Sequence, residues 1–362
     1  MNETPNETAN LQANQIEEFE RITSLVTAEF QIEESLIKEG IPTYYLTWPQ
    51  ETKQSFLRLL NHLEEFELIA LLRRINDRIV LRVVRKPAVK SSNPKTFLIL
   101  LFATIATTFL TGYFSFSETG ISPILSGAFF SVAILLVLGI HEMGHKLTAN
   151  RKKIDATPPY FIPGPPPLGT MGAVIMQKSL PRNRDALFDV GANGPLAGFI
   201  VAFIFSALGL LLLIPVDIPP SEGTLTLMPS SWILLSAFFS NLNLLPQAPP
   251  NGVLHLHPIT LAGWAGMVVT MLNLLPAAML DGGHVTRATL VGDRPRKILT
   301  FASIILLLLV GTEFMFMAFL IIFMSTFKHP GPLDDVSSLS RSRKLLTIAL
   351  IAAFVLAFPI RV

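Results

Sequence analysis

Apolar residues gather in seven runs after residue 95, and short polar segments separate them. Runs near twenty residues long match the thickness of a lipid bilayer, so they predict transmembrane helices. The expected spans are Thr96–Phe116, Ser122–Leu147, Val190–Ile214, His257–Leu280, Lys297–Val310, Glu313–Phe327 and Lys344–Ile360. Two of these spans are short, so Lys297–Phe327 could form a tight pair or one long tilted helix. Trp232–Leu245 is apolar but brief, which favours an interfacial or re-entrant piece.

The pattern is different before residue 96, where charged residues interrupt the apolar ones. Residues 16–95 hold 12 of the 28 Lys and Arg residues and 12 of the 26 Asp and Glu residues. Gln50–His62 has the periodicity of an amphipathic helix, and alternation in Phe66–Ile75 and Arg78–Val84 predicts two strands. We therefore expect a small α+β domain over 16–95 with a docking or regulatory role.

The first fifteen residues are rich in Asn, Thr and Glu, which predicts a disordered tail over 1–15. Met1–Asn14 lacks the basic start and apolar core of a signal peptide, so none is expected. The expected organisation is this tail, the α+β domain over 16–95 and a transmembrane domain over 96–362.

Composition supports a membrane protein, because half of the residues are hydrophobic, 15% are charged and the mean hydropathy is +0.51. A soluble domain carries about a quarter charged residues, so a soluble globular enzyme is excluded as the main interpretation. The absence of cysteine excludes disulfides, thiolate zinc sites and cysteine nucleophiles. A net charge of +2 gives no argument for nucleic acid as a partner.

The distribution of Lys and Arg predicts the orientation in the membrane. Segments 117–121, 215–256 and 311–312 contain none, whereas 148–189, 281–296 and 328–343 contain twelve. An excess of Lys and Arg marks the cytoplasmic side. With seven spans, the α+β domain is then cytoplasmic and the C-terminus is outside.

His141-Glu142-Met143-Gly144-His145 is an H-E-x-x-H motif on the second expected span. Residues four apart share one face of a helix, so both imidazoles could bind one zinc ion. Glu142 could then take a proton from the attacking water. The motif lies ten residues before Arg151, about 15 Å along a helix, and ionisable residues at such depth are usually functional. A packed polar cluster without metal is the alternative.

A catalytic zinc needs a third protein ligand. The Gly and His that metzincins place after the second His are Thr148 and Arg151 here, and no Glu occurs between Glu142 and Glu222. The best remaining candidate is Asp281, which ends an expected span on the cytoplasmic side. Pro276 would break the helix before it, and the glycines after it would permit a turn. Capping of the next element is the alternative role for Asp281.

The H-E-x-x-H motif and the later Asn273-Leu274-Leu275-Pro276-Ala277-Ala278-Met279-Leu280-Asp281-Gly282 resemble those of the site-2 protease family of intramembrane zinc metalloproteases. The resemblance covers about residues 95–335. It implies one zinc ion held by His141, His145 and Asp281, with Glu142 as general base. It implies hydrolysis of a peptide bond within or near a substrate's transmembrane helix. The N-terminal domain and the Asn-Pro-Lys-Thr start of the first span resemble the cyanobacterial and plastid branch.

Other positions follow from the same resemblance. Gly169 and Gly172 belong to a segment that resembles the family's edge strand, which could hold an unwound substrate by main-chain pairing, although a proline-rich loop on the membrane is the alternative. Asn273 could bind the substrate backbone or the developing oxyanion, or bridge two helices. Gly194-Pro195-Leu196-Ala197-Gly198 resembles another family motif, for which close helix packing is the favoured role.

Together, these observations predict an all-α polytopic membrane protein. It has about seven transmembrane helices, a membrane-associated β-hairpin or edge strand, and a small N-terminal α+β soluble domain. The expected partners are the lipid bilayer and single-span or otherwise membrane-embedded protein substrates, in a plasma membrane or an internal, thylakoid-like one. A metal or ion transporter and a catalytically inactive scaffold remain alternatives, as does an integral-membrane zincin with a Glu ligand. Oligomeric state is open.

Overall fold

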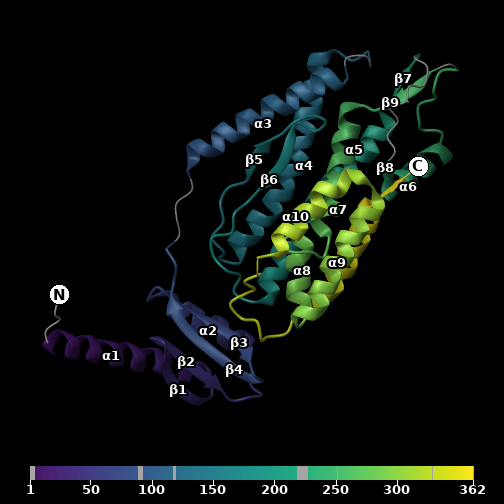
Figure 1. Ribbon diagram of the computed structural model, residues 1–362. Coiled ribbons are helices and arrows are strands. Elements are labelled where there is room, and N and C mark those ends of the chain that lie inside the picture. The colour runs from purple at the N-terminus through teal and green to yellow at the C-terminus, as the bar shows by residue number, and fades with distance from the viewer. Residues whose placement is uncertain are drawn as a thin grey trace. The chain divides into compact units, whose positions relative to one another are not determined.

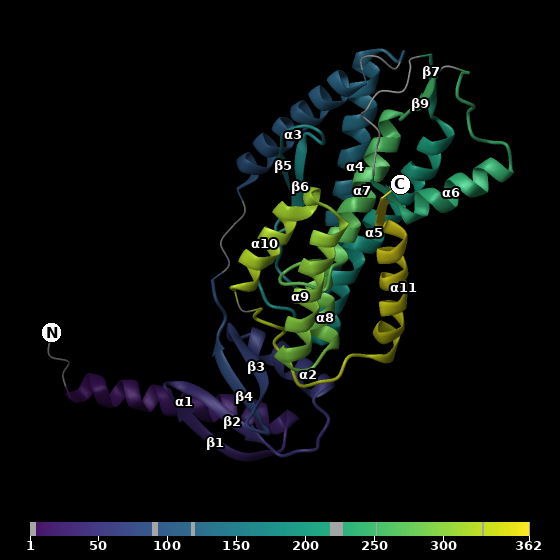
Figure 2. The same ribbon diagram turned by 45° about the vertical axis from the view of Figure 1, so that its right-hand side comes forward.

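The computed structural model describes residues 5–88, 93–116, 120–217, 227–250, 252–327 and 329–361, with side chains from residue 16 onward. The chain forms two compact units, whose elements are labelled in Figures 1 and 2. Unit 1 comprises Met1–Val89, Leu180–Ala186 and Gly331–Leu339. Unit 2 comprises Lys90–Ser179, Leu187–Pro330 and Ser340–Val362. Two segments of unit 1, Leu180–Ala186 and Gly331–Leu339, therefore lie in the sequence between parts of unit 2.

Unit 1 is an antiparallel sheet with two helices. Its elements are α1 (Pro5–Glu29), β1 (Ile32–Lys38), β2 (Ile41–Leu46), α2 (Lys53–Glu64), β3 (Leu68–Ile75) and β4 (Arg78–Arg85), with the strand order β1-β2-β4-β3. Both hairpins turn on two residues with positive φ, Glu39-Gly40 and Asn76-Asp77, as tight two-residue hairpins require. Phe56, Leu72 and Tyr44 are fully buried in the core of the unit.

The predicted helix and the two predicted strands of this region are present as α2, β3 and β4. The hairpin β1–β2 was not predicted, although Glu39-Gly40 between apolar residues was its local signal. Helix α1 begins at Pro5, so residues 5–15 differ from the expected disordered tail. Six of these eleven residues are Ala, Leu, Gln or Glu, which favour a helix. Residues 1–4 of that tail lie outside the described residues.

Two segments from far along the chain extend the sheet of unit 1 beyond its edge strand β3. The Leu72 N–H donates to the Leu333 carbonyl at 2.9 Å, and the Asp335 N–H donates to the Leu72 carbonyl at 3.1 Å. Leu333 and Asp334 in turn donate to the carbonyls of Pro181 and Arg182, at 2.8 and 3.1 Å. Both additions run parallel to their neighbours. The edge of β3 is thereby paired, as sheet edges in stable proteins usually are.

Unit 2 contains the remaining helices. They are α3 (Pro94–Ser115), α4 (Pro123–Arg151), α5 (Arg184–Leu211, whose first residues belong to unit 1), α6 (Ser230–Asn241), α7 (Pro258–Leu274), α8 (Asp281–Thr289), α9 (Asp293–Val310), the 3-10 helix η1 (Thr312–Phe314), α10 (Met315–Ser325) and α11 (Arg341–Ala357). Three short two-stranded sheets pair β5 (Tyr160–Pro163) with β6 (Thr170–Val174), β7 (Ile214–Val216) with β9 (Val253–His255), and β8 (Leu227–Pro229) with β10 (Pro359–Arg361).

Within the described residues, α3, α4 and α5 are long and apolar enough to cross a membrane. The other four expected spans coincide with α7, α9, α10 and α11, which are shorter or carry more charge. The span expected over His257–Leu280 ends early, because Leu275 precedes Pro276 and takes an extended conformation, with φ −55° and ψ 130°. Asp281 therefore begins α8 instead of ending a span.

Glycines bring α4, α5 and α7 into close contact. A Cβ on Gly266 of α7 would lie 2.6 Å from Val137 of α4 and 2.7 Å from Ala202 of α5. A Cβ on Gly263 would lie 2.6 Å from the main-chain nitrogen of Ser206. Helices in membranes associate through small residues because these let backbones approach closely. Helix α7 is therefore packed directly against α5 and against α4, the helix that carries the H-E-x-x-H motif.

Because residues 333–335 pair with β3, we predict that Phe56→Ala will destabilise β3 and residues 333–335 to the same extent. Removing this fully buried ring is expected to cost about 3–5 kcal/mol of local stability. Hydrogen exchange followed by mass spectrometry should then show faster exchange in β3 and in residues 333–335 by the same factor. Phe66→Ala is the control, because Phe66 is 40% exposed. Rapid exchange of residues 333–335 in the wild-type protein would contradict the strand addition.

Candidate metal centre

Helix α4 carries His141, Glu142 and His145 within its second half. Their residues are 3%, 7% and 5% exposed, so all three are shielded from solvent. The helix begins with Pro123, whose fixed φ suits the first helical position, and ends at Arg151. Because the motif lies well inside this continuous helix, the spacing of four residues places both imidazoles on one face.

Asp281 meets these imidazoles from the start of α8. Its Oδ2 lies 3.3 Å from Nε2 of His141 and 3.2 Å from Nε2 of His145. The two Nε2 atoms are themselves 3.2 Å apart. The three side chains that the sequence predicts as ligands thus converge on one point, as the group positioned to hold a metal ion.

The three distances fit a tetrahedral metal site. Zinc in proteins is held at about 2.0–2.2 Å by nitrogen and oxygen ligands, so ligand atoms at tetrahedral angles lie roughly 3.3 Å apart. The observed separations of 3.2–3.3 Å agree with this value. Two nitrogens and one carboxylate oxygen leave the fourth position for water or substrate, as catalytic zinc sites require.

The second nitrogen of His145 is fixed by the main chain. Its Nδ1 donates to the carbonyl of Val190 on α5 at 2.7 Å. With the proton on Nδ1, the neutral ring directs the lone pair of Nε2 towards Asp281. Such a hydrogen bond orients the ring of a metal ligand and raises its basicity.

One face of α5 consists of Gly191, Gly194 and Gly198, and the ligand residues rest on it. A Cβ on Gly194 would lie 2.1 Å from Nε2 of His145, and one on Gly198 would lie 2.8 Å from Nδ1 of His141. A Cβ on Gly191 would lie 2.8 Å from the carbonyl oxygen of Asp281. Spacings of three and four residues place the three glycines on one side of the helix. Each of the three residues that could hold a metal ion therefore contacts bare α5 backbone.

Glu142 and Asn273 flank the three ligand residues. Oε1 of Glu142 lies 3.9 Å from Nε2 of His141, and its carboxylate lies beside the main chain of Ile175. Asn273 lies in the last turn of α7, with Nδ2 3.2 Å from Nε2 of His141. The structure therefore brings Asn273 next to His141, and its role in binding substrate stays a prediction.

The hairpin β5–β6 lies beside α4 and α3. Gly169 immediately precedes β6 and packs against α3, where its carbonyl accepts a hydrogen bond from Thr107 at 2.6 Å. Gly172 lies within β6, and a Cβ there would meet no atom within 4 Å. The expected strand is present, but neither glycine contacts the three ligand residues. Ile175, just beyond β6, is the point at which this segment meets the centre.

The two glycines after Asp281 lie in a helix and not in a turn, and no side chain would fit at either position. Gly282 and Gly283 lie in the first turn of α8, and Cβ atoms there would lie 2.2 Å from the carbonyl of Leu274 and 2.4 Å from that of Ala278. Nδ1 of His284, three residues after Asp281, lies 2.8 Å from Nε2 of His329.

Sequence reasoning missed the Val190 carbonyl and the function of the glycine face. Gly194 and Gly198 were assigned to helix packing, which is correct, but their partners are the two imidazoles. The i, i+3, i+7 spacing of Gly191, Gly194 and Gly198 was a signal for a bare helix face. It gave no indication of which helix would lie against it. The Val190 contact has no sequence signal, because any residue supplies a carbonyl.

We predict that Gly194→Ala will lose bound metal, because the added methyl group overlaps the ring of His145 and must displace it. Metal content per chain, measured by mass spectrometry of the purified protein, should fall well below one. Gly139→Ala is the matched control on α4, since a Cβ there meets only Phe161, at 3.4 Å. Equal metal content in both variants would contradict the contact.

Comparison with known proteins gives a consistent result. The probable zinc metalloprotease EGY2, chloroplastic, of Arabidopsis thaliana is 34% identical over 206 residues, covering 56% of this chain and 35% of that protein. Its namesake in Oryza sativa subsp. indica is 31% identical over 216 residues, covering 58% and 38%. The probable zinc metalloprotease EGY1, chloroplastic, of Oryza sativa subsp. japonica is 34% identical over 163 residues, covering 44% and 28%. The chain thus spans about a third of the length of these curated relatives.

The family model described as Peptidase family M50 matches residues 129–317, just over half of the chain. The matched region runs from within α4 to the start of α10 and includes His141, Glu142, His145, the glycine face and Asp281. On this evidence, the chain belongs to peptidase family M50.

Proposed function

We propose that this protein is an intramembrane zinc metalloprotease that hydrolyses peptide bonds within or near transmembrane helices of membrane-embedded protein substrates. The observation that carries the proposal is the convergence of His141, His145 and Asp281 at 3.2–3.3 Å with Glu142 beside them. The relatives are themselves described as probable zinc metalloproteases, which supports both the metal and the reaction.

His141, His145 and Asp281 would hold the zinc ion through Nε2, Nε2 and Oδ2. When bound, zinc would supply a Lewis acid that polarises a carbonyl group and lowers the pKa of water to about 7. Imidazole and carboxylate donors suit this ion, and the chain has no thiolate to offer.

Glu142 would act as the general base, since its carboxylate lies next to the ligand set. It takes a proton from the attacking water and returns it to the leaving amine. The Asn273 amide, directed at the same point, would donate a hydrogen bond to the developing oxyanion. Burial of Glu142 would strengthen its electrostatic interactions by excluding bulk water.

Strand β6 would hold the substrate in an extended conformation. It pairs with β5 on one edge, and its other edge has no partner strand in the part of the chain that the structure describes. A peptide added there would pair through its main chain, and it would lie close to Glu142 through the segment at Ile175. A substrate helix must unwind to do this, which explains why the site is next to a strand edge.

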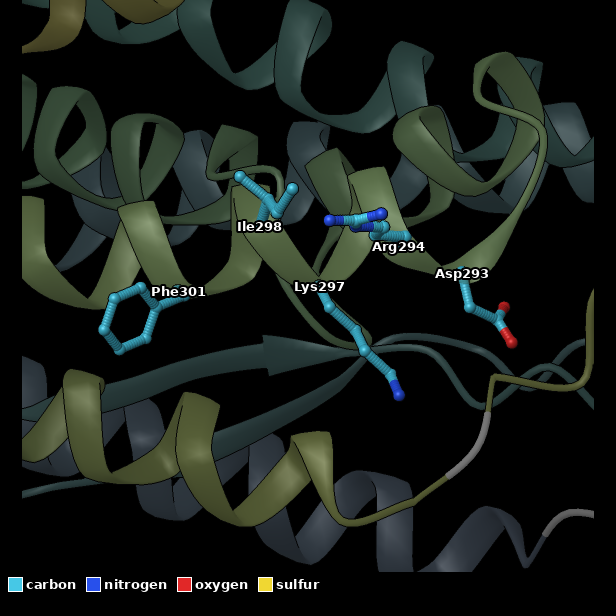
Figure 3. Close-up of a pocket in the computed structure, with 5 residues that line it drawn as sticks. All are labelled: Asp293, Arg294, Lys297, Ile298 and Phe301. Atoms are coloured by element: carbon cyan, nitrogen blue, oxygen red, sulfur yellow. The ribbon is translucent and has the colours of Figure 1, made fainter.

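We place the N-terminal domain on the cytoplasmic side of a multi-pass protein. The basic start of α9 supports this orientation, because Arg294 and Lys297 are followed by the exposed apolar residues Ile298 and Phe301. Figure 3 shows these side chains around a shallow pocket at that end of the helix. Basic side chains at the end of an apolar helix face mark a membrane boundary, and their excess marks the cytoplasmic face. The membrane would be a plasma membrane or an internal, thylakoid-like one, as the chloroplastic relatives suggest.

The rival functions fit less well. A metal or ion transporter would distribute polar residues along a path. Among the described residues, a single group of three or more His, Asp or Glu side chains converges closely enough to hold an ion. An inactive scaffold would have no need for Glu142 next to an intact ligand set.

We predict that Glu142→Gln will abolish peptide cleavage and keep the metal. The amide cannot accept the proton, and loss of general base catalysis costs about 10²–10⁴-fold in rate. Cleavage should be measured against single-span proteins that co-purify with the variant from its native membrane and are absent with the wild type. The same partners with both proteins, and no cleavage product from the wild type, would support the scaffold instead.

Asp281→Ala is the companion variant for the metal. It removes one of three ligands and should lower the zinc content of the purified protein below one per chain. Zinc retained at full stoichiometry would contradict the ligand assignment and favour a different site.

The proposed orientation can be tested with single cysteines, because the sequence contains none. Glu39→Cys lies in the exposed β1–β2 turn, and Gln247→Cys lies in the exposed segment after α6. In vesicles with the cytoplasmic side inward, a membrane-impermeant maleimide should label Gln247→Cys directly and Glu39→Cys only after permeabilisation. Equal labelling of both in sealed vesicles would contradict the orientation.

A further inference from the structure

A charge cluster lies one residue before the carbonyl that holds His145. Its centre is Asp189, in the second turn of α5, whose side chain is 13% exposed. Nε and Nη2 of Arg343 donate to its two oxygens, each at 2.6 Å. Nζ of Lys152, the residue that caps the end of α4, lies 2.8 Å from Oδ2 of Asp189. The cluster therefore joins α4, α5 and α11 through one carboxylate.

We propose that Asp189, held by Arg343 and Lys152, is a positioning residue for the metal ligand His145. It fixes the first turns of α5, so that the Val190 carbonyl meets Nδ1 of His145. This inference rests on the proposed function, because it deepens the account of the same zinc site.

The geometry favours this role over a general stabilising one. A bidentate Arg–carboxylate pair restrains both position and orientation, which a single contact does not. Val190 follows Asp189 directly in the chain. The Val190 carbonyl accepts a hydrogen bond from Nδ1 of His145 at 2.7 Å. Gly194, which lies against the ring of the same His145, follows one turn later on α5. A shift at the start of α5 would therefore move both contacts that position this imidazole.

The arginine of this cluster comes from a helix outside the region that the family model matches. Arg343 belongs to α11, beyond the region 129–317 that the family model matches. Helix α11 thus reaches the metal centre through Asp189 without contributing a ligand. Hydrogen-bond partners of metal ligands typically affect metal affinity by about 10–100-fold, so a defect in this support should be measurable.

The test is zinc affinity and the visible spectrum of the cobalt-substituted full-length protein. Asp189→Asn removes the charge with little change in shape, and Arg343→Lys keeps the charge but loses the bidentate contact. Arg296→Ala is the matched control. It breaks an arginine–aspartate pair within α9, where the side chain of Asp293 is 72% exposed. Only the monodisperse fraction with wild-type helix content is measured, so that misfolding does not enter the comparison.

We expect Asp189→Asn to weaken zinc binding by up to about 10-fold, the lower end of the effect of a direct hydrogen-bond partner, and to change the cobalt absorption bands. Arg343→Lys should give a smaller change in the same direction, and Arg296→Ala should give none. Wild-type affinity and spectrum in both Asp189→Asn and Arg343→Lys would overturn the inference, even with reduced thermal stability. A zinc-loaded wild type that cleaves no substrate would refute the protease proposal alone, because the affinity and spectral comparison does not depend on cleavage.

Discussion

Helix α5 presents Gly191, Gly194 and Gly198 along one face, and the residues that would hold the metal rest on its backbone. This contact is a steric constraint that the rest of the centre depends on. The imidazoles of α4 and the carboxylate at the start of α8 can converge only if no side chain lies between them and α5. The same constraint explains why α7, which carries Asn273, has glycines at its own contacts with α4 and α5.

The hydrogen bonds around the centre complement this packing. A buried imidazole and carboxylate are costly in apolar surroundings unless each finds a partner. His145 finds one in the Val190 carbonyl, and a bound cation would satisfy the three converging ligand atoms together. The ion pairs of Asp189 lie next to this support, so electrostatics at the end of three helices and ligand geometry inside them are parts of one arrangement.

Much of this could be predicted from the sequence, and the limits have physical causes. His141 and His145 were identified because helical spacing alone places them together. Asp281 was reached by excluding other third ligands and was then supported by the family resemblance, because 136 residues separate it from His145 and no local rule brings the two together. The first strands of unit 1 were missed because β1 carries several charged residues on an edge. The break in the helix at Pro276 was predicted from the sequence. The start of a new helix, α8, at Asp281 was not predicted. The number of membrane crossings and the side of the membrane stay predictions.

The sheet of unit 1 has a consequence for how the protein is made. Its edge strand β3 is complete before residue 76, whereas the segment that pairs with it, 333–335, comes only after α10. During synthesis from the N-terminus, α3 to α10 are therefore made before residues 333–335 are available to pair with the edge of β3. Pairing over more than 250 residues closes a long loop, which makes it a late step in folding. The sheet of unit 1 can therefore be completed only after the chain has been synthesised beyond α10.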